Sequence, residues 1–237
     1  MKDMNESLME NKVLEEQYAE IQRNLIDKIE LNDKLLPKEI QFISGVDLAY
    51  WKDKDIDYAV CCIVTINYAT KDVVEIRSMI DSIDVDYIPG YLSFRELPLI
   101  LKTFKLLKSK TDILIFDGNG YLHYRNMGVA THASFYLNKP TIGVAKSYLK
   151  IDNVDYTMPE DQDGAYSDIV IKGKVYGRAV RTHKGIKPIF VSCGNWVTLD
   201  TATDIVLSLV DDDSRQPLPT RLADIETRRQ RKIITGT

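Results

Sequence analysis

Cysteine is scarce in this chain of 237 residues, which holds three: Cys61, Cys62 and Cys193. An odd number without metal-ligand spacing predicts reduced, buried thiols and argues against a disulfide framework or a zinc site. The chain also lacks an apolar run long enough to cross a membrane, and its first residues, MKDMNESLMENKV, are too polar for a signal peptide. We therefore expect a globular cytoplasmic protein that does not bind membranes.

Positive charge is not in excess, because the formal net charge is −4. A net-acidic chain does not coat nucleic acid by bulk electrostatics. Acidic residues are, however, missing from residues 118–151 and 169–199. The second stretch contains six cations: Lys172, Lys174, Arg178, Arg181, Lys184 and Lys187. Such runs are often only a solvated face, but two of them in an acidic chain allow a local phosphate-binding surface.

Hydrophobic patterning predicts one mixed α/β domain over residues 1–237, with an N-terminal helix packed on it and a short flexible C-terminal tail. Apolar spacings of three and four predict helices, and β-rich apolar runs predict strands. The expected elements are a helix at 10–30, strands at 41–50, 57–70 and 73–83, a helix at 98–108, a strand at 112–118, a helix at 126–137 and a strand at 140–147. The first three strands should form an antiparallel meander, and the helices should cover one mixed sheet.

Carboxylates at the ends of predicted elements are the first candidates for chemistry. Asp47 and Asp117 lie near the carboxyl ends of strands, where α/β sheets place their sites, and Glu96 lies at a helix entrance. Asp47 should face away from the apolar side of its strand, with Gly45 and Ala49 leaving room beside it. Three such carboxylates can hold Mg²⁺.

Each candidate carboxylate can also be explained by a structural role. Ser93 and Glu96 fit a capping box, Asp117 can begin the turn DGNG, and Asp47 can be a turn or edge carboxylate. His123 and His132 can be core histidines. Lys146 stands at the end of an apolar strand, where its charge requires a partner or an open cleft.

Two short motifs are incomplete. GVAKS lacks the glycine directly before Lys146 and the earlier glycine that a phosphate-binding P-loop requires. DGNGYL lacks the third ligand and the glycine of a calcium loop. Neither ATP nor Ca²⁺ is therefore expected as a ligand.

Several longer blocks occur in a recognisable order. GVDLAY, YIPGYLSFRELP, FDGNGYLHYRNMGVATH, PTIGVAKSYL and PTRLAD stand in the order found in endonuclease V, and the chain resembles that family from about residue 10 to residue 230. The resemblance implies a ribonuclease H-like fold, with three antiparallel strands followed by parallel ones. It also implies an endonuclease that nicks nucleic acid 3′ to a deaminated base such as hypoxanthine. Hydrolysis of the second phosphodiester bond 3′ of the lesion, leaving 5′-phosphate and 3′-hydroxyl ends, would initiate DNA repair.

The resemblance also assigns roles to residues. Asp47, Glu96 and Asp117 match the metal-binding carboxylates, Lys146 matches the active-site lysine, and Asp224 matches a position near the metals that is His in some members. The wedge that parts the strands beside the lesion matches Tyr87, Ile88, Pro89 and Gly90. The pocket for the flipped base matches Gly90, Leu92, Gly118 and His123. Asn195 and Trp196 depart from a His-Arg pair found in many members, and Tyr124 departs from a proline; these changes bear on substrate preference.

Cofactor and partners follow from the same resemblance. Mg²⁺ is the expected metal, with Mn²⁺ able to substitute, and the expected partner of a monomeric enzyme is DNA containing deaminated bases. RNA remains open, because carboxylate chemistry serves both nucleic acids. A binding module without catalysis remains open as well, and so does a resolvase or transposase with a ribonuclease H-like fold.

Overall fold

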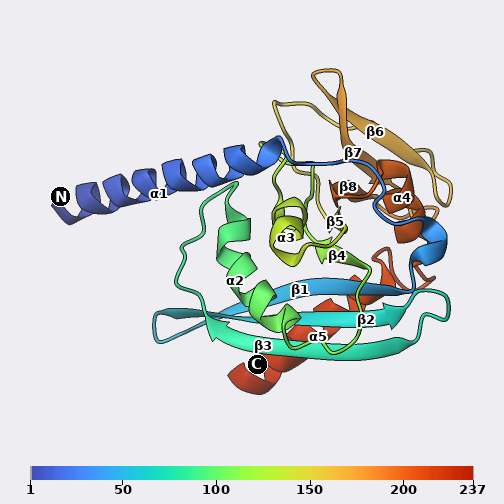
Figure 1. The fold of residues 1–237 in the computed structure, drawn as a ribbon. Helices are drawn as coiled ribbons and strands as arrows, with labels where there is room; N and C mark the ends of the chain where they lie inside the picture. The colour runs from blue at the N-terminus through green and yellow to red at the C-terminus, as the bar shows by residue number, and fades with distance from the viewer. Residues whose placement is uncertain (1, 237) are drawn as a thin grey trace.

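The computed structural model describes residues 2–236, and the side chains of residues 12–236. Eight strands form one mixed sheet with helices on both faces (Figure 1). The elements are α1 (Lys2–Ile26), a 3-10 turn (Pro37–Glu39), β1 (Phe42–Asp53), β2 (Ile56–Asn67), β3 (Val73–Ser82), α2 (Leu92–Phe104), β4 (Ile113–Asp117), α3 (Val129–Leu137), β5 (Thr141–Ala145), β6 (Tyr166–Ile171), β7 (Lys174–Val180), β8 (Ile189–Asn195), α4 (Leu199–Ser208) and α5 (Leu218–Thr235).

The strands are ordered β3-β2-β1-β4-β5-β8-β7-β6. The predicted antiparallel meander of β1, β2 and β3 is confirmed, and β4 and β5 lie parallel to β1 and to each other. Parallel central strands are covered on both faces, which is why β4 and β5 read as continuous apolar runs. The antiparallel strands β8, β7 and β6 complete the sheet, beyond the elements predicted from the sequence.

Two apolar layers hold the helices to the sheet. On one face, Val46 of β1 packs with Leu97 and Ile100 of α2. On the other face, Ile43 of β1 lies in a cluster with Ala223 of α5. Alternate residues of β1 therefore face opposite helices, and Asp47 points to the α5 face, as its strand position predicts.

The space beside Gly45 is filled by α5. A Cβ atom at Gly45 would lie 2.1 Å from the carbonyl carbon of Pro219. Glycine thus lets the first turn of α5 pack directly on the β1 backbone. The room that the sequence suggested beside Asp47 is used by the chain itself, and it brings α5 against the carboxylate.

The three predicted helices, now α1, α2 and α3, differ from the prediction in their bounds, and α4 and α5 were not predicted. α2 begins at Leu92 rather than at residue 98, so Pro98 lies inside the helix. α5 continues through Thr235 and is capped by Gly236, where the sequence suggested a short flexible tail. Within residues 2–236, no helix combines the length and the apolar character that a membrane crossing needs. The three cysteines are buried free thiols, as predicted.

Candidate active site

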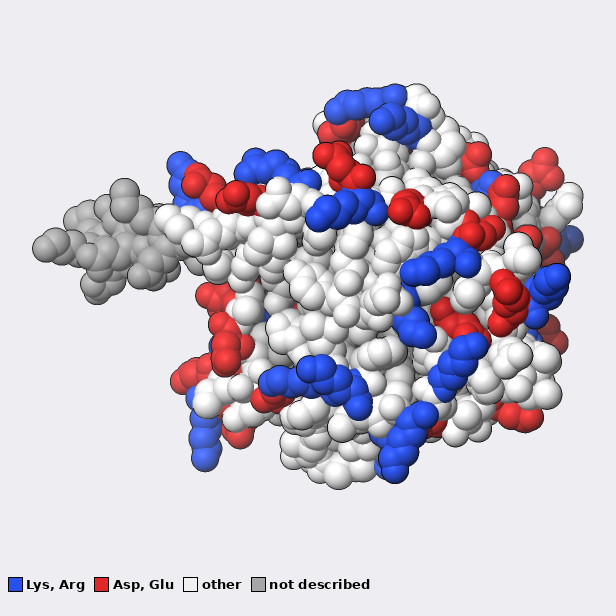
Figure 2. Space-filling model, viewed as in Figure 1, with Lys and Arg blue, Asp and Glu red and all other residues white. Residues whose placement is uncertain are grey.

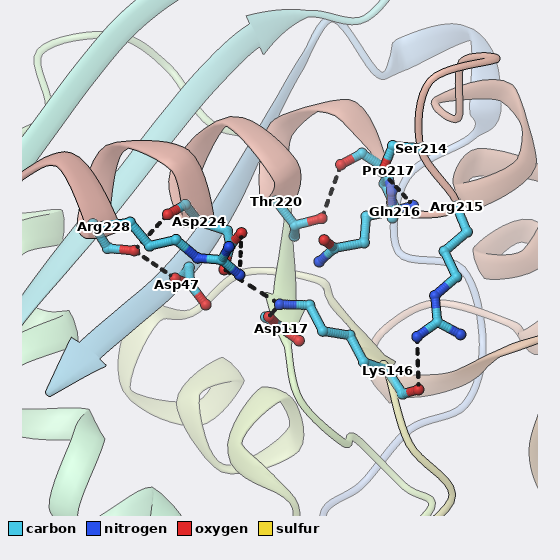
Figure 3. Close-up of polar contacts among 11 residues, drawn as sticks. Asp47, Asp117, Lys146, Ser214, Arg215, Gln216, Pro217, Thr220, Asp224 and Arg228 are labelled. Atoms are coloured by element: carbon cyan, nitrogen blue, oxygen red, sulfur yellow. Dashed lines mark hydrogen bonds and ion pairs between the residues drawn. The ribbon is translucent and has the colours of Figure 1, made fainter.

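Three carboxylates converge where the parallel pairing of β1 and β4 ends (Figure 3). Asp47 comes from β1, Asp117 ends the neighbouring parallel strand β4, and Asp224 comes from α5. Each offers an oxygen atom, and these atoms all lie within 4.8 Å of one another. The parallel pairing of β1 and β4 and the close approach of α5 at Gly45 together create this cluster.

The cluster carries more negative charge than its surroundings neutralise. Burial raises the pKa of Asp47 to about 7; a hydrogen bond from Thr227 opposes that rise, and the charges of Asp117 and Asp224 add to it. The Thr227 hydroxyl donates to Asp47 Oδ2 at 2.7 Å and so fixes the carboxylate plane. A divalent cation with oxygen ligands would favour the ionised form of Asp47, and the three converging carboxylate oxygens fit such an ion.

Glu96 lies beside this cluster. Among the described residues it falls outside the group within 4.8 Å, and its Oε1 accepts a 2.7 Å hydrogen bond from the Tyr50 hydroxyl. Burial raises the pKa of Glu96 to about 7, the Tyr50 hydrogen bond lowers it, and the nearby charges of Asp47 and Asp117 raise it again. Glu96 therefore belongs to the same electrostatic environment while its orientation is set by Tyr50.

The interpretation of Glu96 as part of a capping box is wrong. Tyr91 occupies the N-cap position of α2. The Ser93 hydroxyl lies 2.7 Å from Nδ1 of His132, which is fully buried. Both side chains of the expected box thus bind partners elsewhere, because α2 starts earlier than the sequence suggested.

Lys146 points from the end of β5 into the carboxylates. Its Nζ lies 2.5 Å from Asp117 and 3.3 Å from Asp224. Burial lowers the pKa of Lys146, but the hydrogen bond and charge of Asp117 and the charges of Asp224 and Asp47 outweigh it, so the net shift is upward. The lysine is charged at neutral pH, and its place at the end of an apolar strand is explained by these partners.

Residues near α5 support the cluster in ways that were not predicted from the sequence. Thr227 lies one helical turn after Asp224, a spacing that could have indicated a shared face. Arg228 lies 3.0 Å from Asp224. Arg215, before the helix, donates to the carbonyl oxygen of Lys146 at 3.3 Å (Figure 3) and to that of Pro188 at 3.1 Å. The turn that starts α5 is therefore tied to the backbone that carries Lys146.

One open cleft borders the carboxylates, and a second borders Lys146. One, of about 410 Å³, is lined by Asp47, Leu48, Ala49, Tyr50, Asp224, Thr227, Arg228 and Arg231. The other, of about 420 Å³, is lined by Lys146, Ser147, Tyr148, Tyr156, Met158, Lys187, Pro188, Phe190 and Arg215. The carboxylates are thus reachable from the first cleft, and the second cleft reaches Lys146.

The predicted wedge is a surface turn. The Tyr91 amide donates to the Ile88 carbonyl at 2.9 Å, and Gly90 has φ +82°, the pattern of a type II turn with Pro89 at its second position. Ile88 is buried and anchors the turn, while Tyr87 is 62% exposed. The aromatic ring is therefore presented to solvent by a rigid backbone.

The predicted pocket residues surround this turn and the cluster. His123 is buried, and the amide of Arg125 donates to its Nδ1 at 3.3 Å. Burial, together with the charge of Arg125, lowers the pKa of His123 to about 4, so the ring is neutral at pH 7. Gly118 directly follows Asp117, and Leu92 begins α2 just after the turn. Arg125 also donates to the Gly90 carbonyl at 2.5 Å, so the same residue contacts both His123 and the wedge.

The acid-free stretches do not form a continuous basic surface. Arg178 is buried and pairs with Asp168 at 2.9 Å and Asp200 at 2.6 Å. Arg181 is also buried and donates to the backbone carbonyl of Glu160 at 2.8 Å. On the face shown in Figure 2, basic and acidic side chains alternate around a broad uncharged area. Two of the six cations in residues 169–199 therefore serve packing around β7, whereas the four lysines, Lys172, Lys174, Lys184 and Lys187, are exposed.

The departures from the family pattern lie outside the cluster. The Asn195 side-chain oxygen accepts the Glu30 amide at 2.8 Å, and the Lys34 ammonium lies 4.0 Å from the Trp196 ring. Both residues thus hold the segment that follows α1. Tyr124 is half exposed beside His123.

Comparisons with known proteins agree with this geometry. The family model described as Endonuclease V matches residues 23–225. Endonuclease V of Bacillus thuringiensis subsp. konkukian is 57% identical over 95% of this chain and 96% of its own. The crystal structure of the Bacillus subtilis endonuclease V superposes with a TM-score of 0.91, at 50% identity and 94% coverage of both chains.

A more distant structure was determined with nucleic acid. Ciona intestinalis endonuclease V, in complex with a 24mer DNA containing an inosine followed by a ribo-adenosine, matches with a TM-score of 0.84. It is 29% identical, with 94% of this chain and 99% of that chain covered. The ribonuclease H-like fold implied by the sequence blocks is confirmed by these superpositions. The chain belongs to the endonuclease V family of hydrolytic nucleases.

Proposed function

We propose that this protein nicks DNA on the 3′ side of a deaminated base, with hypoxanthine as the main lesion, in a reaction that requires a divalent metal and starts DNA repair. The observation that carries the proposal is the convergence of Asp47, Asp117 and Asp224 with Lys146 at the strand ends. A family member crystallised with inosine-containing DNA supports the choice of substrate. Cleavage at the second phosphodiester bond 3′ of the lesion would leave 5′-phosphate and 3′-hydroxyl ends.

The carboxylates would hold Mg²⁺, with Mn²⁺ as a substitute. Asp47, Asp117 and Asp224 provide the oxygen ligands, and Glu96 lies beside them in the same negative environment. Bound there, the metal supplies Lewis-acid polarisation of the phosphate and a water activated at neutral pH. Thr227 and Tyr50 orient Asp47 and Glu96 through their hydroxyl hydrogen bonds.

Lys146 would act on the reacting phosphate. Its ammonium is held within a few ångströms of Asp117 and Asp224, so it lies where negative charge develops during cleavage. A fixed positive charge at that point stabilises the transition state more than the ground state. Arg215 assists by fixing the backbone of Lys146.

Recognition of the base would depend on the wedge and on His123. Tyr87 offers an exposed ring on which a neighbouring base can stack. Because His123 is neutral and its Nδ1 accepts the Arg125 amide, its Nε2 carries the proton and is a donor. A donor favours the carbonyl oxygen that deamination creates over the amino group that it removes. Weak pairing of the deaminated base also reduces the cost of extruding it.

A side-by-side nicking assay tests the proposal. Matched DNA and RNA strands with one inosine, and the same strands with adenosine, are incubated with Mg²⁺, with Mn²⁺ or with a chelator. We expect metal-dependent nicking of inosine-containing DNA. Cleavage of the RNA alone would instead identify an inosine-specific endoribonuclease, and tight binding without cleavage would identify a binding module.

A further inference from the structure

Two arginines hold the wedge turn, residues 87–90, through backbone carbonyls near its two ends. Arg95 of α2 donates to the Val85 carbonyl at 2.5 Å, before the turn, and Arg125 donates to the Gly90 carbonyl at 2.5 Å, at its end. Tyr87 projects between these two attachments. The position of the turn therefore depends on what holds the two guanidinium groups.

Arg125 is held from the side of α1. Its Nε donates to Oε1 of Gln22 at 2.5 Å, and its guanidinium lies 4.0 Å from the Tyr91 ring. Gln22 is completely buried, and its amide nitrogen lies 3.5 Å from the Met127 carbonyl. A buried glutamine from the N-terminal helix thus provides one of the two acceptors that fix the arginine fork.

Aromatic stacking attaches the same part of α1 to the start of α2. The Tyr18 ring lies 3.9 Å from the Phe94 ring at an interplanar angle of 11°, and 5.8 Å from the Tyr91 ring. Figure 1 shows α1 extending away from the body, so its last turns are where it meets the rest of the fold. The segment that touches the body is the segment that reaches the wedge.

One residue, Arg125, therefore joins three parts of the molecule. Its Nε binds α1, its Nη2 binds the wedge turn, and its backbone amide binds Nδ1 of His123. The guanidinium is planar, so its two donors reach their acceptors together only when Gln22 and Gly90 are correctly placed. Gly90 also lacks a Cβ atom, which would lie 2.9 Å from Nη2.

We propose that Gln22 and Arg125 form a clasp through which α1 sets the position of the wedge against the base pocket. Both are positioning residues, and α1 becomes a determinant of lesion specificity. The inference rests on the proposed roles of Tyr87 and His123. Loss of the clasp should leave the carboxylate cluster in place while the wedge is misplaced, so the defect should appear in KM and in lesion preference rather than in kcat.

Gln22→Met removes both side-chain hydrogen bonds while keeping the side-chain volume. We expect it to lower the preference for inosine-containing over undamaged DNA about tenfold, the scale of one hydrogen bond to a charged group. Gln17→Met makes the same change at an exposed site on the same helix and is the matched control. Arg125→Lys keeps the charge but loses the fork and should reproduce the defect, which provides a second variant if Gln22→Met folds poorly.

A double-mutant cycle separates the clasp from general stabilisation. If α1 acts through the wedge, Gln22→Met should add little in a Tyr87→Ala background, because the ring it positions is gone. If Gln22→Met lowers lesion preference by its full factor in the Tyr87→Ala background as well, the proposal is overturned. It is also overturned if the wild-type enzyme nicks inosine-containing DNA normally and both Gln22→Met and Arg125→Lys have the same lesion preference as the control Gln17→Met. If the wild-type enzyme does not nick inosine-containing DNA, the proposed function is wrong, and the proposed role of the clasp is wrong because it depends on that function.

Discussion

The carboxylate cluster and the wedge turn are built in opposite ways. The cluster takes its side chains from β1, from the ends of β4 and β5 and from α5, and each charged group is paired or hydrogen-bonded. The wedge is a surface turn that presents one exposed ring, and it is held through backbone carbonyls by Arg95 and Arg125. One site is partly buried and electrostatically crowded, and the other is exposed and carries its function on an uncharged aromatic ring.

This difference predicts how each site fails. Charges in a buried cluster depend on one another, so removing one should disturb the reaction itself. A stacking ring on a turn acts on the substrate before the reaction, so its loss should weaken selection of the lesion. The comparison would be wrong if a cluster variant lost only lesion selection, or if a wedge variant lost only reaction rate.

The largest effect is expected for Asp47→Asn. The amide keeps the size of the side chain and can still accept the Thr227 hydrogen bond, but it removes the charge from the cluster. Turnover should fall by at least about 10³-fold, beyond the cost of a single electrostatic contact. Adding Asp117→Asn should cost little more, since the carboxylates act as a unit.

DNA binding by Asp47→Asn should survive, because a negative charge facing phosphate is gone. Single-turnover nicking and gel-shift titration measure the two quantities. Asp213→Asn, at an exposed position, is the control. Near-normal turnover in Asp47→Asn would remove this residue from the metal site.

Lys146→Met should produce the next largest loss. Methionine keeps most of the apolar stem, so folding should be preserved while the charge facing Asp117 and Asp224 is lost. We expect single-turnover nicking at saturating metal to fall about 10²–10³-fold. Lys150→Met, which removes an exposed ion pair with Asp155, should be neutral.

A purely structural role for Lys146 predicts a different result. The lysine would then only neutralise the carboxylates, and Lys146→Met would change melting temperature and metal affinity with a modest effect on rate. An unchanged single-turnover rate at saturating metal would therefore end the catalytic assignment.

Tyr87→Ala should affect selection more than reaction. The ring is mostly exposed, so its removal should leave the fold and the cluster intact. Loss of one stacking contact is worth about 1–3 kcal/mol, or roughly 5- to 150-fold in preference for the deaminated base. Competition between inosine-containing and undamaged strands measures it, with Tyr166→Ala as an exposed control on β6. Equal losses on both strands would separate Tyr87 from recognition.

The sequence was sufficient for the first half of the sheet and its acidic residues. β4 and β5 have the apolar runs that central strands require, and Asp117 and Lys146 stand where those runs end, whereas Asp47 lies within the longer β1. The sequence also contains a pattern typical of the β6–β7 hairpin. A two-residue link, Lys172 and Gly173, joins these strands, and both residues have positive φ, a conformation that glycine favours in such turns. That turn could have identified the second half of the sheet.

Long-range partners could not be predicted from local patterns. Thr227 binds Asp47 across 180 positions, and Gln22 binds Arg125 across 103. The spacing of Thr227 from Asp224 could indicate a shared helix face, but no spacing identifies Asp47 as its partner, and none links Gln22 to Arg125. Charge counting overstated the free positive charge for the same reason, because Arg178 is paired with Asp168 and Asp200, which flank the acid-free stretch and meet the arginine only in the fold.

The smallest expected effect concerns stability without metal. Burial and neighbouring charges raise the pKa of Asp47 and Glu96 to about 7, well above their values in an unfolded chain. The folded state then binds more protons than the unfolded state between about pH 4 and 7, so the free energy of unfolding should fall as the pH rises through that window. In chelator at pH 8, Asp47→Asn should therefore be more stable than the wild-type protein by on the order of 1 kcal/mol, about 2–4 °C in melting temperature.

At pH 4 the difference should vanish, and Mg²⁺ should reverse it at pH 8 by stabilising only the protein with an intact cluster. Tyr87→Ala should follow the wild-type pH profile throughout, because the wedge carries none of this electrostatic stress. A wild-type melting temperature that rises between pH 5 and 8 in chelator, relative to Asp47→Asn, would show that the carboxylates are not crowded in the way that the geometry requires.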